Sequence, residues 1–562
     1  MSLRGTPGPA QPFLAAALRQ LFPGRPIVVI TEGLKTQEVF HQDVETWVRL
    51  LSGANQGRAA ASARSASLLF YPAWETLPHE SKLPHADVIS ERLETLVALS
   101  HHASRTASHA PLVVSSVTAL LQRTFRAEQI RQRTRTLTKG DHLDPLDLVE
   151  WLEEQGYEPE VQVNHKGEIA LRGGIVDVFP LTSPWPVRLE FFGDELESLR
   201  EFDPITQVSR EGIESVTIPP GGELGLLKRM VERAAAAPSL PSGTPSSTPG
   251  GGVGRGEETL ATLLDYLPAN AIILLCEPPA LDEHAATYAE MVPKGDPFFI
   301  DWGGVQERMG RAGMTVVRLS DEGRAGILPA PGGAATNQPH VEADAGQAGC
   351  LPYLEFLSLD AFRPIAERAA EPQVAETQRR EFFAQLHRWI RQGHGVHVFC
   401  NNDGERERFR EIWKEYGLEE VSREGDEGGE GQRLTATVPA QPSLPSSPSR
   451  DTPPRLHIHL GALSRGFLCD AAKLVVVTDA EIFGRYKVQR PRRLKSPHAQ
   501  TSRSLLEIDF TDLQEGDYVV HLEHGIGRYL GLGMMPLASG VKKLEKAEIG
   551  RASCRERVLQ VV

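Results

Sequence analysis

Apolar runs and amphipathic stretches alternate along much of the chain. Continuous runs such as PLVVSSV (111–117), AIILLCE (271–277) and KLVVVTDAE (473–481) are typical of strands buried on both faces. In VISERLETLVAL (88–99), apolar side chains recur every three or four residues, which predicts a helix with one buried face. REFFAQLHRWIRQG (380–393) shows the same spacing and ends at a glycine, a helix stop signal. The pattern therefore predicts a multidomain α/β protein.

Residues 165–218 show a different pattern, with short alternating stretches separated by turn signals. EIALR-GG-IVDVFP predicts a hairpin that turns at Gly173-Gly174, and PVRLEFF-GD-ELESLREF predicts a second that turns at Gly193-Asp194. The sequence therefore predicts an antiparallel β-rich module inserted between α/β segments.

Alternation along VRLEFF sorts its side chains onto two faces of a strand. The expected core set is Val187, Leu189 and Phe191, and the opposite set is Arg188, Glu190 and Phe192. An arginine beside an exposed aromatic ring is the composition of an interaction hot spot, and Arg172 lies one hairpin away. The alternative is an ordinary sheet surface with Phe192 covered by a loop, and the residues alone leave both interpretations open.

The segment VVITEGLKTQE (28–38) carries Lys35-Thr36 after a buried strand, where a phosphate-binding loop keeps such a pair. The motif G-x-x-x-x-G-K-[ST] needs glycine at both fixed positions so that backbone N–H groups can surround the phosphates. Val29 and Leu34 occupy those positions. The sequence therefore predicts a degenerate loop that binds no nucleotide.

Near the C-terminus, GDYVVHLEHGIGRYLGLGMM (516–535) predicts two short strands around a glycine-rich turn, the start of a small β-barrel. His521 and His524 flank Glu523, but strand residues three apart point to opposite faces, so we predict no metal site. The preceding stretch FGRYKVQRPRRLK (483–495) holds six cations. It is either a solvated connector or a DNA contact.

Composition narrows the function classes. A length of 562 residues suggests roughly four domains, and the net charge of −14 argues against a chain that binds nucleic acid over its whole surface. The five cysteines are far apart and form no C-x-x-C motif, so we expect a cytoplasmic protein without disulfides or a zinc ribbon. The absence of an apolar run of 18 residues predicts no membrane partner. Stretches rich in Pro, Ser and Gly read as flexible insertions: 234–256, 439–454 and, more weakly, 323–349.

Three long motifs resemble a known family. LFYPAWETLPHESKLPHADVISERLETL (69–96) resembles the first lobe shared by the excision-repair protein UvrB and the bacterial transcription-repair coupling factors (the Mfd family). LRGGIVDVFPLTSPWPVRLEFFGDELESLREFDPITQVS (171–209) is similar to the damage-recognition-partner domain of both. GDYVVHLEHGIGRYLGL (516–532) resembles the RNA-polymerase-interacting, CarD-like module of the coupling factors, which UvrB lacks.

The resemblance implies transcription-coupled nucleotide excision repair, in which the family recognises stalled RNA polymerase and recruits UvrA. The family's UvrA-binding patch falls by motif on Arg172, Arg188 and Phe192. The residues that match the module for the polymerase β subunit are His521, Glu523, His524, Gly525, Gly527, Arg528 and Tyr529. The alternatives are a UvrB-like subunit of the excision nuclease and a CarD-like transcription regulator.

In the full-length family, ATP and Mg serve a DNA-translocating motor that acts on double-stranded DNA. None of the motor motifs occurs here, so the resemblance implies no ATP hydrolysis and no cofactor in this chain. The family pattern stops after SGVK, and EIGRASCRERV (548–558) looks like translated adapter sequence. We therefore expect an incomplete SH3/Tudor-like barrel, about 45 poorly ordered terminal residues, and weak or absent polymerase binding.

The expected domains are a flexible N-terminus (1–22), a UvrB-like α/β lobe in two parts (23–125 and 221–365, with an insertion at 234–256), the UvrA-binding β-rich module (126–220), a small α/β domain (366–490, with an insertion at 423–454), a basic linker (491–512), the truncated polymerase module (513–547) and a non-native tail (548–562).

Overall fold

The computed structural model describes residues 2–51, 68–102, 110–236, 260–321, 355–360, 372–415, 456–478, 481–482, 518–521, 525–532, 547–551 and 558–560. The chain divides into two compact units, 1–491 and 492–562, each described here by itself. Helices and several sheets are mixed, as a multidomain α/β chain requires. Within the described ranges, no helix is both long enough and apolar enough to cross a bilayer.

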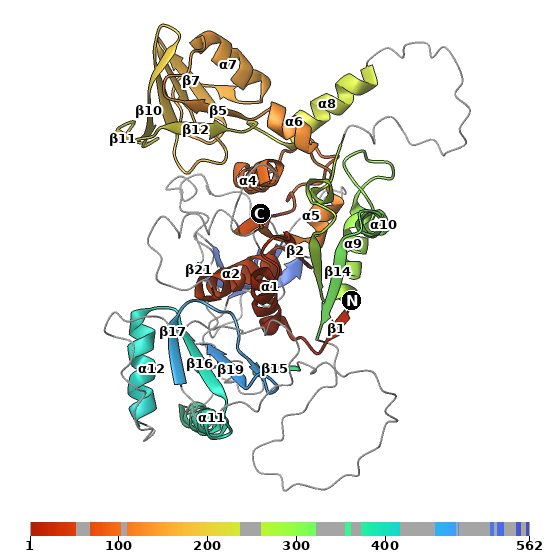
Figure 1. The fold of residues 1–562 in the computed structure, drawn as a ribbon, viewed down its shortest axis with the longest axis vertical. Helices are drawn as coiled ribbons and strands as arrows, with labels where there is room; N and C mark the ends of the chain where they lie inside the picture. The colour runs from red at the N-terminus through yellow and green to blue at the C-terminus, as the bar shows by residue number, and fades with distance from the viewer. Residues whose placement is uncertain are drawn as a thin grey trace, which may run out of the picture. The chain divides into compact units, whose positions relative to one another are not determined.

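The first sheet has six strands in the order β1-β14-β13-β2-β4-β3, and every neighbouring pair runs parallel. Figure 1 labels β1, β14 and β2 of this sheet. Its strands are β1 (Ser2–Arg4), β2 (Ile27–Thr31), β3 (Leu68–Tyr71), β4 (Leu112–Ser116), β13 (Ile272–Cys276) and β14 (Thr315–Ser320). The predicted strands in 111–117 and 271–277 are confirmed as β4 and β13. Their continuous apolar character follows from burial on both faces.

Alternate residues of the central strands enter two different hydrophobic cores. Val28 and Ile30 pack in one core, and Ile27 and Val29 pack in the other. The first core is covered by α4 (Ala86–His102), α5 (Val117–Leu121), α6 (Ala127–Gln132), α8 (Leu224–Ala236), η2 (Leu263–Tyr266), α9 (Pro278–Met291) and α10 (Trp302–Arg311). The second is covered by η1 (Gly8–Ala10), α1 (Gln11–Leu21) and α2 (Leu34–Leu51).

The N-terminal residues correct one expectation. Residues 1–22 were expected to be flexible, but β1 pairs with β14 and α1 packs on the second core through the buried Ala15 and Ala16. The apolar stripe of α1 is short and alanine-rich, and the partner strand of β1 is β14, near the other end of this lobe's sequence. Periodicity within the segment therefore did not reveal it.

The β-rich module forms a six-stranded sheet in the order β11-β10-β9-β8-β7-β6, with the pair β12-β5 beside it. Its elements are β5 (Arg135–Thr138), α7 (Pro145–Glu154), β6 (Glu158–Pro159), β7 (Glu168–Arg172), β8 (Ile175–Val178), β9 (Val187–Phe192), β10 (Glu195–Phe202), β11 (Ser209–Gly212) and β12 (Ser215–Ile218). Both predicted hairpins are confirmed, β7–β8 around Gly173-Gly174 and β9–β10 around Gly193-Asp194. Leu148 and Leu152 of α7 cover one face of the sheet.

A second α/β sheet has the order β15-β18-β19-β16-β17. Its elements are β15 (Phe356–Ser358), α11 (Pro372–Arg391), β16 (Gly395–Cys400), α12 (Asp403–Glu415), β17 (Leu456–Leu460), β18 (Phe467–Cys469) and β19 (Leu474–Thr478). The helix predicted for 380–393 is confirmed within α11, and Gly393 just after it has a φ of 85°. The strand predicted for 473–481 is confirmed as β19.

The two α/β sheets share a core, which we call the seam. The Trp47 ring on α2 lies 5.3 Å from that of Phe399 on β16 and 5.0 Å from that of Phe13 on α1. Phe13 also contacts Phe356 and Phe467 of the second sheet. The expected domains 23–125 and 366–490 are therefore packed together through one aromatic cluster.

The described residues of the unit 492–562 form antiparallel strands that pair in chain order: β20 (Tyr518–His521), β21 (Gly525–Leu532), β22 (Ala547–Arg551) and β23 (Val558–Gln560). The two strands predicted for 516–535 are confirmed as β20 and β21. About 45 terminal residues were expected to be poorly ordered, but β22 and β23 pair within them.

The predicted insertions lie largely outside the described residues. The helix α8 runs to Ala236, so the first three residues of the insertion predicted at 234–256 are helical. The stretches 323–349, 439–454 and 483–495 lie outside the described residues.

Candidate functional site

The face of the β-rich sheet opposite α7 carries the charged and aromatic residues that the sequence singled out. Val187 and Leu189 are fully buried in the α7-covered core, and Phe191 packs at its margin. Arg188, Glu190 and Phe192 alternate with them and therefore lie on the opposite face, which we call the open face. The predicted sorting of VRLEFF onto two faces is thus confirmed.

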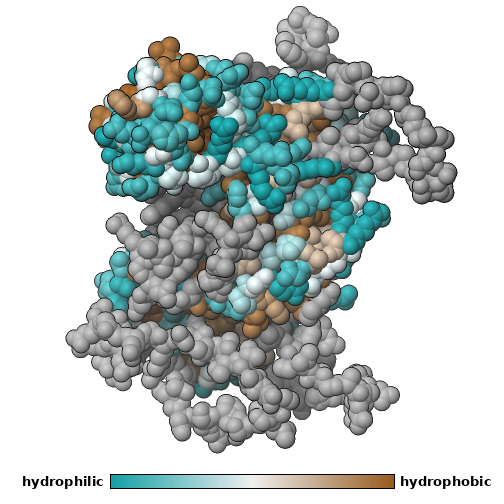
Figure 2. Space-filling view, turned by 45° about the horizontal axis from the view of Figure 1, so that its top comes forward, coloured by the Kyte–Doolittle hydropathy of each residue, from teal (hydrophilic) through white to brown (hydrophobic). Residues whose placement is uncertain are grey.

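Phe192 is the most exposed aromatic residue of the open face. It ends β9 immediately before the turn at Gly193, which has a φ of 64°, and 78% of its surface is exposed. No loop in the described part of the chain covers the ring, which removes the alternative that Phe192 is tucked under a neighbour. Figure 2 shows hydrophobic residues at the surface of this module, whose exposed apolar members also include Val161, Leu171, Ile205 and Val208.

Arg188 is held firmly by groups of its own module. Its Nε and Nη2 donate to Oδ1 and Oδ2 of Asp177 on β8, each at 2.8 Å, and its guanidinium lies 4.7 Å from the ring centre of Phe202. The side chain of Asp177 is 2% exposed and that of Arg188 is 18% exposed. The hydrogen bonds to Asp177 raise the pKa of Arg188 above its ordinary value. Among the described residues Nη1 has no hydrogen-bond partner, so this nitrogen remains for another molecule.

Arg172 reaches the same face from β7. The register pairs Arg172 with Ile175 on β8, and Ile175 with Glu190 on β9. Arg172 is the last residue of β7 and Phe192 is the last residue of β9, so both lie at the end of the sheet where the two hairpins turn. The guanidinium donates from Nη2 to the carbonyl of Val161 at 2.6 Å and remains exposed. A Cβ at Gly174 would lie 2.9 Å from the carbonyl oxygen of Phe191, so this glycine permits the close approach of the first hairpin to β9.

Sequence reasoning placed Glu190 on the open face but missed the second carboxylate, Asp177. Asp177 neutralises Arg188, and Glu190 accepts a hydrogen bond from Ser198 and lies 3.8 Å from Arg200. The signal was available only through register, because Asp177 and Arg188 become neighbours when β8 and β9 pair. The open face therefore combines compensated charges with one large uncovered ring.

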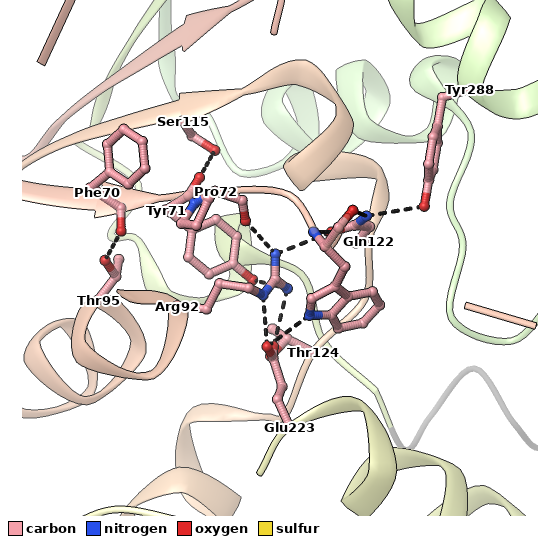
Figure 3. Close-up of polar contacts among 11 residues, drawn as sticks. Phe70, Tyr71, Pro72, Arg92, Thr95, Ser115, Gln122, Thr124, Glu223 and Tyr288 are labelled. Atoms are coloured by element: carbon pink, nitrogen blue, oxygen red, sulfur yellow. Dashed lines mark hydrogen bonds and ion pairs between the residues drawn. The ribbon is translucent and has the colours of Figure 1, made fainter. Parts of the chain in front are cut away.

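A buried ion pair fastens the module to the first lobe (Figure 3). Arg92 on α4 donates from Nε to Glu223 Oε2 at 2.7 Å, and both side chains are completely buried. Glu223 precedes α8, where the chain returns from the module. The same carboxylate accepts hydrogen bonds from Trp74 Nε1 at 2.9 Å and from Thr124 Oγ1 at 2.7 Å.

The remaining donors of Arg92 are also satisfied. Nη2 donates to the Tyr71 hydroxyl at 2.6 Å and Nη1 to the Pro72 carbonyl at 2.8 Å. The guanidinium lies 4.2 Å from the Tyr71 ring centre, and Gln122 links the network to Tyr288 on α9. Burial and the nearby Glu223 carboxylate raise the pKa of the Tyr71 hydroxyl. The network therefore joins α4 of the lobe to the segment before α8, where the chain returns from the module.

The connection between β2 and α2, where the sequence predicted a degenerate phosphate loop, is short. Only Glu32 and Gly33 separate β2 from α2, too few for a loop that wraps phosphates. Val29 is buried within β2, and the Thr36 hydroxyl donates to Glu32 Oε1 at 2.7 Å. Leu34 and Lys35 occupy the exposed start of α2.

The residues predicted for polymerase binding fall on β20 and β21. His521 pairs with Gly525, and Tyr518 pairs with Arg528. Gly527 and Tyr529 also lie on β21, whereas Glu523 and His524 lie outside the described residues.

Comparisons with known protein families match two of the regions described above. The UvrB interaction domain family matches residues 136–223, and the CarD-like/TRCF RID domain family matches residues 513–554. The second match includes β22, part of the stretch expected to be a non-native tail.

Curated relatives extend the similarity along the chain. The transcription-repair-coupling factor of Bacillus subtilis (strain 168) is 26% identical over 85% of this chain and 38% of its own length. Those of Myxococcus xanthus and Haemophilus influenzae are 26% and 25% identical, over 83% and 93% of this chain. The chain thus spans about two fifths of the length of these relatives, 38–43%. The chain is therefore similar to part of these transcription-repair-coupling factors.

Proposed function

We propose that this chain, as a coupling-factor N-terminal region, serves transcription-coupled nucleotide excision repair by docking UvrA on the open face. The observation that carries the proposal is Phe192, 78% exposed and flanked on one face by Arg188 and Arg172. Aromatic and arginine side chains dominate the binding energy of protein interfaces. Burying one phenylalanine contributes about 1.5–3 kcal/mol.

The three residues would have different roles in such a complex. Phe192 supplies apolar area, Arg172 supplies an exposed charge, and Arg188 supplies a fixed N–H at Nη1. Glu190 and Arg200 form a polar rim beside them. A hydrophobic centre with a polar margin is the usual anatomy of a specific interface.

The first experiment is a pull-down of purified UvrA with the chain carrying Phe192→Ala. We expect binding to fall by at least about tenfold, since loss of a central aromatic residue removes 2 kcal/mol or more. Leu146→Ala is the matched control, because Leu146 is 64% exposed on α7, across the module from the open face. Equal binding by the two variants would contradict the proposal.

We further propose that residues 513–554 form an incomplete SH3/Tudor-like module that has at most weak affinity for the RNA polymerase β subunit. The support is the CarD-like match and the antiparallel order of β20, β21 and β22. Charge reversal by Arg528→Glu should weaken retention of the β subunit while UvrA binding stays unchanged. Loss of both activities would indicate general misfolding instead.

We propose no nucleotide at the β2–α2 connection and no ATP hydrolysis by the residues present. The two-residue connection favours this over a UvrB-like ATP-dependent subunit. Double-stranded DNA, ATP and Mg remain expectations for the full-length relatives.

A further inference from the structure

Arginines gather where the β-rich module joins the lobe, around the end of α7. Arg133 follows α6 and donates from Nη1 to Gln155 Oε1 at 2.9 Å. Arg229 on α8 reaches the same place, because its Nη2 lies 3.4 Å from the position that a Cβ on Gly156 would take. Arg135 lies over the Trp151 ring at 4.5 Å. Figure 1 shows α6 and α8 side by side at this junction.

Arg233 extends the group by one helical turn along α8. Arg229 and Arg233 are four residues apart and both are exposed, while Leu226, Leu227 and Met230 pack on the lobe core. Burial lowers the pKa of Arg133, and the charges of Arg229 and Arg233 lower it further, which places the three guanidinium groups within electrostatic reach. Glu154 acts in the opposite direction.

These cations are poorly compensated in a chain whose net charge is −14. Among the described residues, Arg229 and Arg233 form no ion pair, whereas Arg308, Arg311, Arg408 and Arg410 each pair with a carboxylate. Like charges held close together repel one another, and Glu154 offsets this only at Arg133, so the arrangement is unfavourable unless an anion neutralises it.

We propose that Arg133, Arg135, Arg229 and Arg233 form a docking surface for the phosphate backbone of duplex DNA. The choice of DNA among polyanions rests on the proposed repair function. The geometry agrees with it, since residues four apart on a helix are separated by about 6 Å along its axis, close to two phosphate steps of one strand at about 3.4 Å each. Planar guanidinium groups also bind phosphate in a bidentate manner.

The test compares duplex binding by fluorescence anisotropy at about 50 mM and about 200 mM salt, for the full chain and for Arg229→Gln/Arg233→Gln. Each phosphate contact contributes about 0.9 to the slope of log affinity against log salt, so the decline in affinity over this range should be about tenfold smaller in the double variant. Arg229→Lys/Arg233→Lys keeps the charges and should keep the decline.

Arg408→Gln/Arg410→Gln is the matched control, since it removes two paired arginines from α12 and produces the same change in net charge. All variants keep the basic stretch 483–495, so any contribution from it cancels. A decline in the Gln variant equal to that of the unmodified chain would overturn the proposal. So would loss of poly-glutamate binding with no change for DNA, which would assign the surface to an acidic protein.

A parallel UvrA pull-down separates this proposal from the proposed function. Retained UvrA binding with reduced DNA affinity in the Gln variant supports both. Retained DNA affinity in the Gln variant overturns only the proposed DNA surface. The expected loss of UvrA binding by Phe192→Ala does not depend on that surface. Circular dichroism confirms that each variant is folded.

Discussion

At the scale of single residues, the open face separates two kinds of side chain. Arg188 is tied to Asp177 and Phe202 and therefore contributes to the module's own stability. Phe192 has no such partners around most of its surface. Strand alternation was sufficient to predict which residues share the face. It could not predict that Arg188 is neutralised, because Asp177 comes from another strand.

This difference predicts two distinct responses to substitution. Asp177→Ala should lower the free energy of unfolding by about 3 kcal/mol, since it leaves a largely buried guanidinium without its carboxylate. Phe192→Ala should change it by less than about 0.5 kcal/mol, as exposed substitutions do. Urea unfolding of both variants measures this, and similar losses would mean that the Phe192 ring is part of the fold.

At the scale of elements, the sequence predicted the long, strongly periodic segments well. β4, β13, β19 and α11 and the two hairpins lie where apolar periodicity and turn glycines indicated. The missed elements are β1, whose partner strand β14 is distant in sequence, and α1, whose apolar stripe is short and alanine-rich. The junction network was missed for the same reason, since Arg92 and Glu223 are 131 positions apart and nothing in the sequence pattern pairs them.

The ion pair between Arg92 and Glu223 should contribute strongly to the stability of the contact between α4 and the segment that precedes α8. Arg92→Met leaves Glu223 buried without a counterion, and we expect a loss of about 3–5 kcal/mol in the free energy of unfolding. Adding Glu223→Leu should restore part of that loss, because the remaining charge is then removed. A double-mutant cycle by chemical unfolding measures the coupling, and strictly additive losses would contradict a direct pairing.

At the scale of the whole molecule, the seam joins the two α/β sheets of residues 1–491. Besides its aromatic cluster, the seam contains a buried carboxylate. Asp43 on α2 accepts a hydrogen bond from the Ser464 backbone N–H at 2.8 Å, and Thr46 donates to the Ala462 carbonyl at 2.7 Å. A Cβ at Gly461 would lie 2.7 Å from a methyl group of Thr46, so the contact is close. Domain limits drawn from the sequence could not show that these parts share a core.

The seam should depend on pH through Asp43. Burial raises the pKa of Asp43 to about 7, while the Ser464 hydrogen bonds lower it and Glu481 raises it. Because the folded state then binds the proton more tightly than the unfolded chain, this contribution is present below about pH 4 and is lost as the pH rises through about 7. Its size is at most about 4 kcal/mol, at 1.36 kcal/mol per pKa unit.

The measurement is urea unfolding of the chain and of Asp43→Asn across this range of pH. The variant should lose most of the decrease in stability with rising pH. A smaller decrease of the same sign should remain, because burial also raises the pKa of Glu481. An unchanged pH dependence in Asp43→Asn would show that other groups are responsible.

The two hydrogen bonds between Arg188 and Asp177 have a consequence for the affinity and selectivity with which a partner binds the open face. A free arginine samples many rotamers, and ordering it opposes association by up to about 2 kcal/mol of conformational entropy. In this module the rotamers of Arg188 are already selected when the sheet folds. A molecule that docks here therefore meets a rigid template, and a partner whose acceptor is slightly misplaced gains nothing from side-chain adjustment.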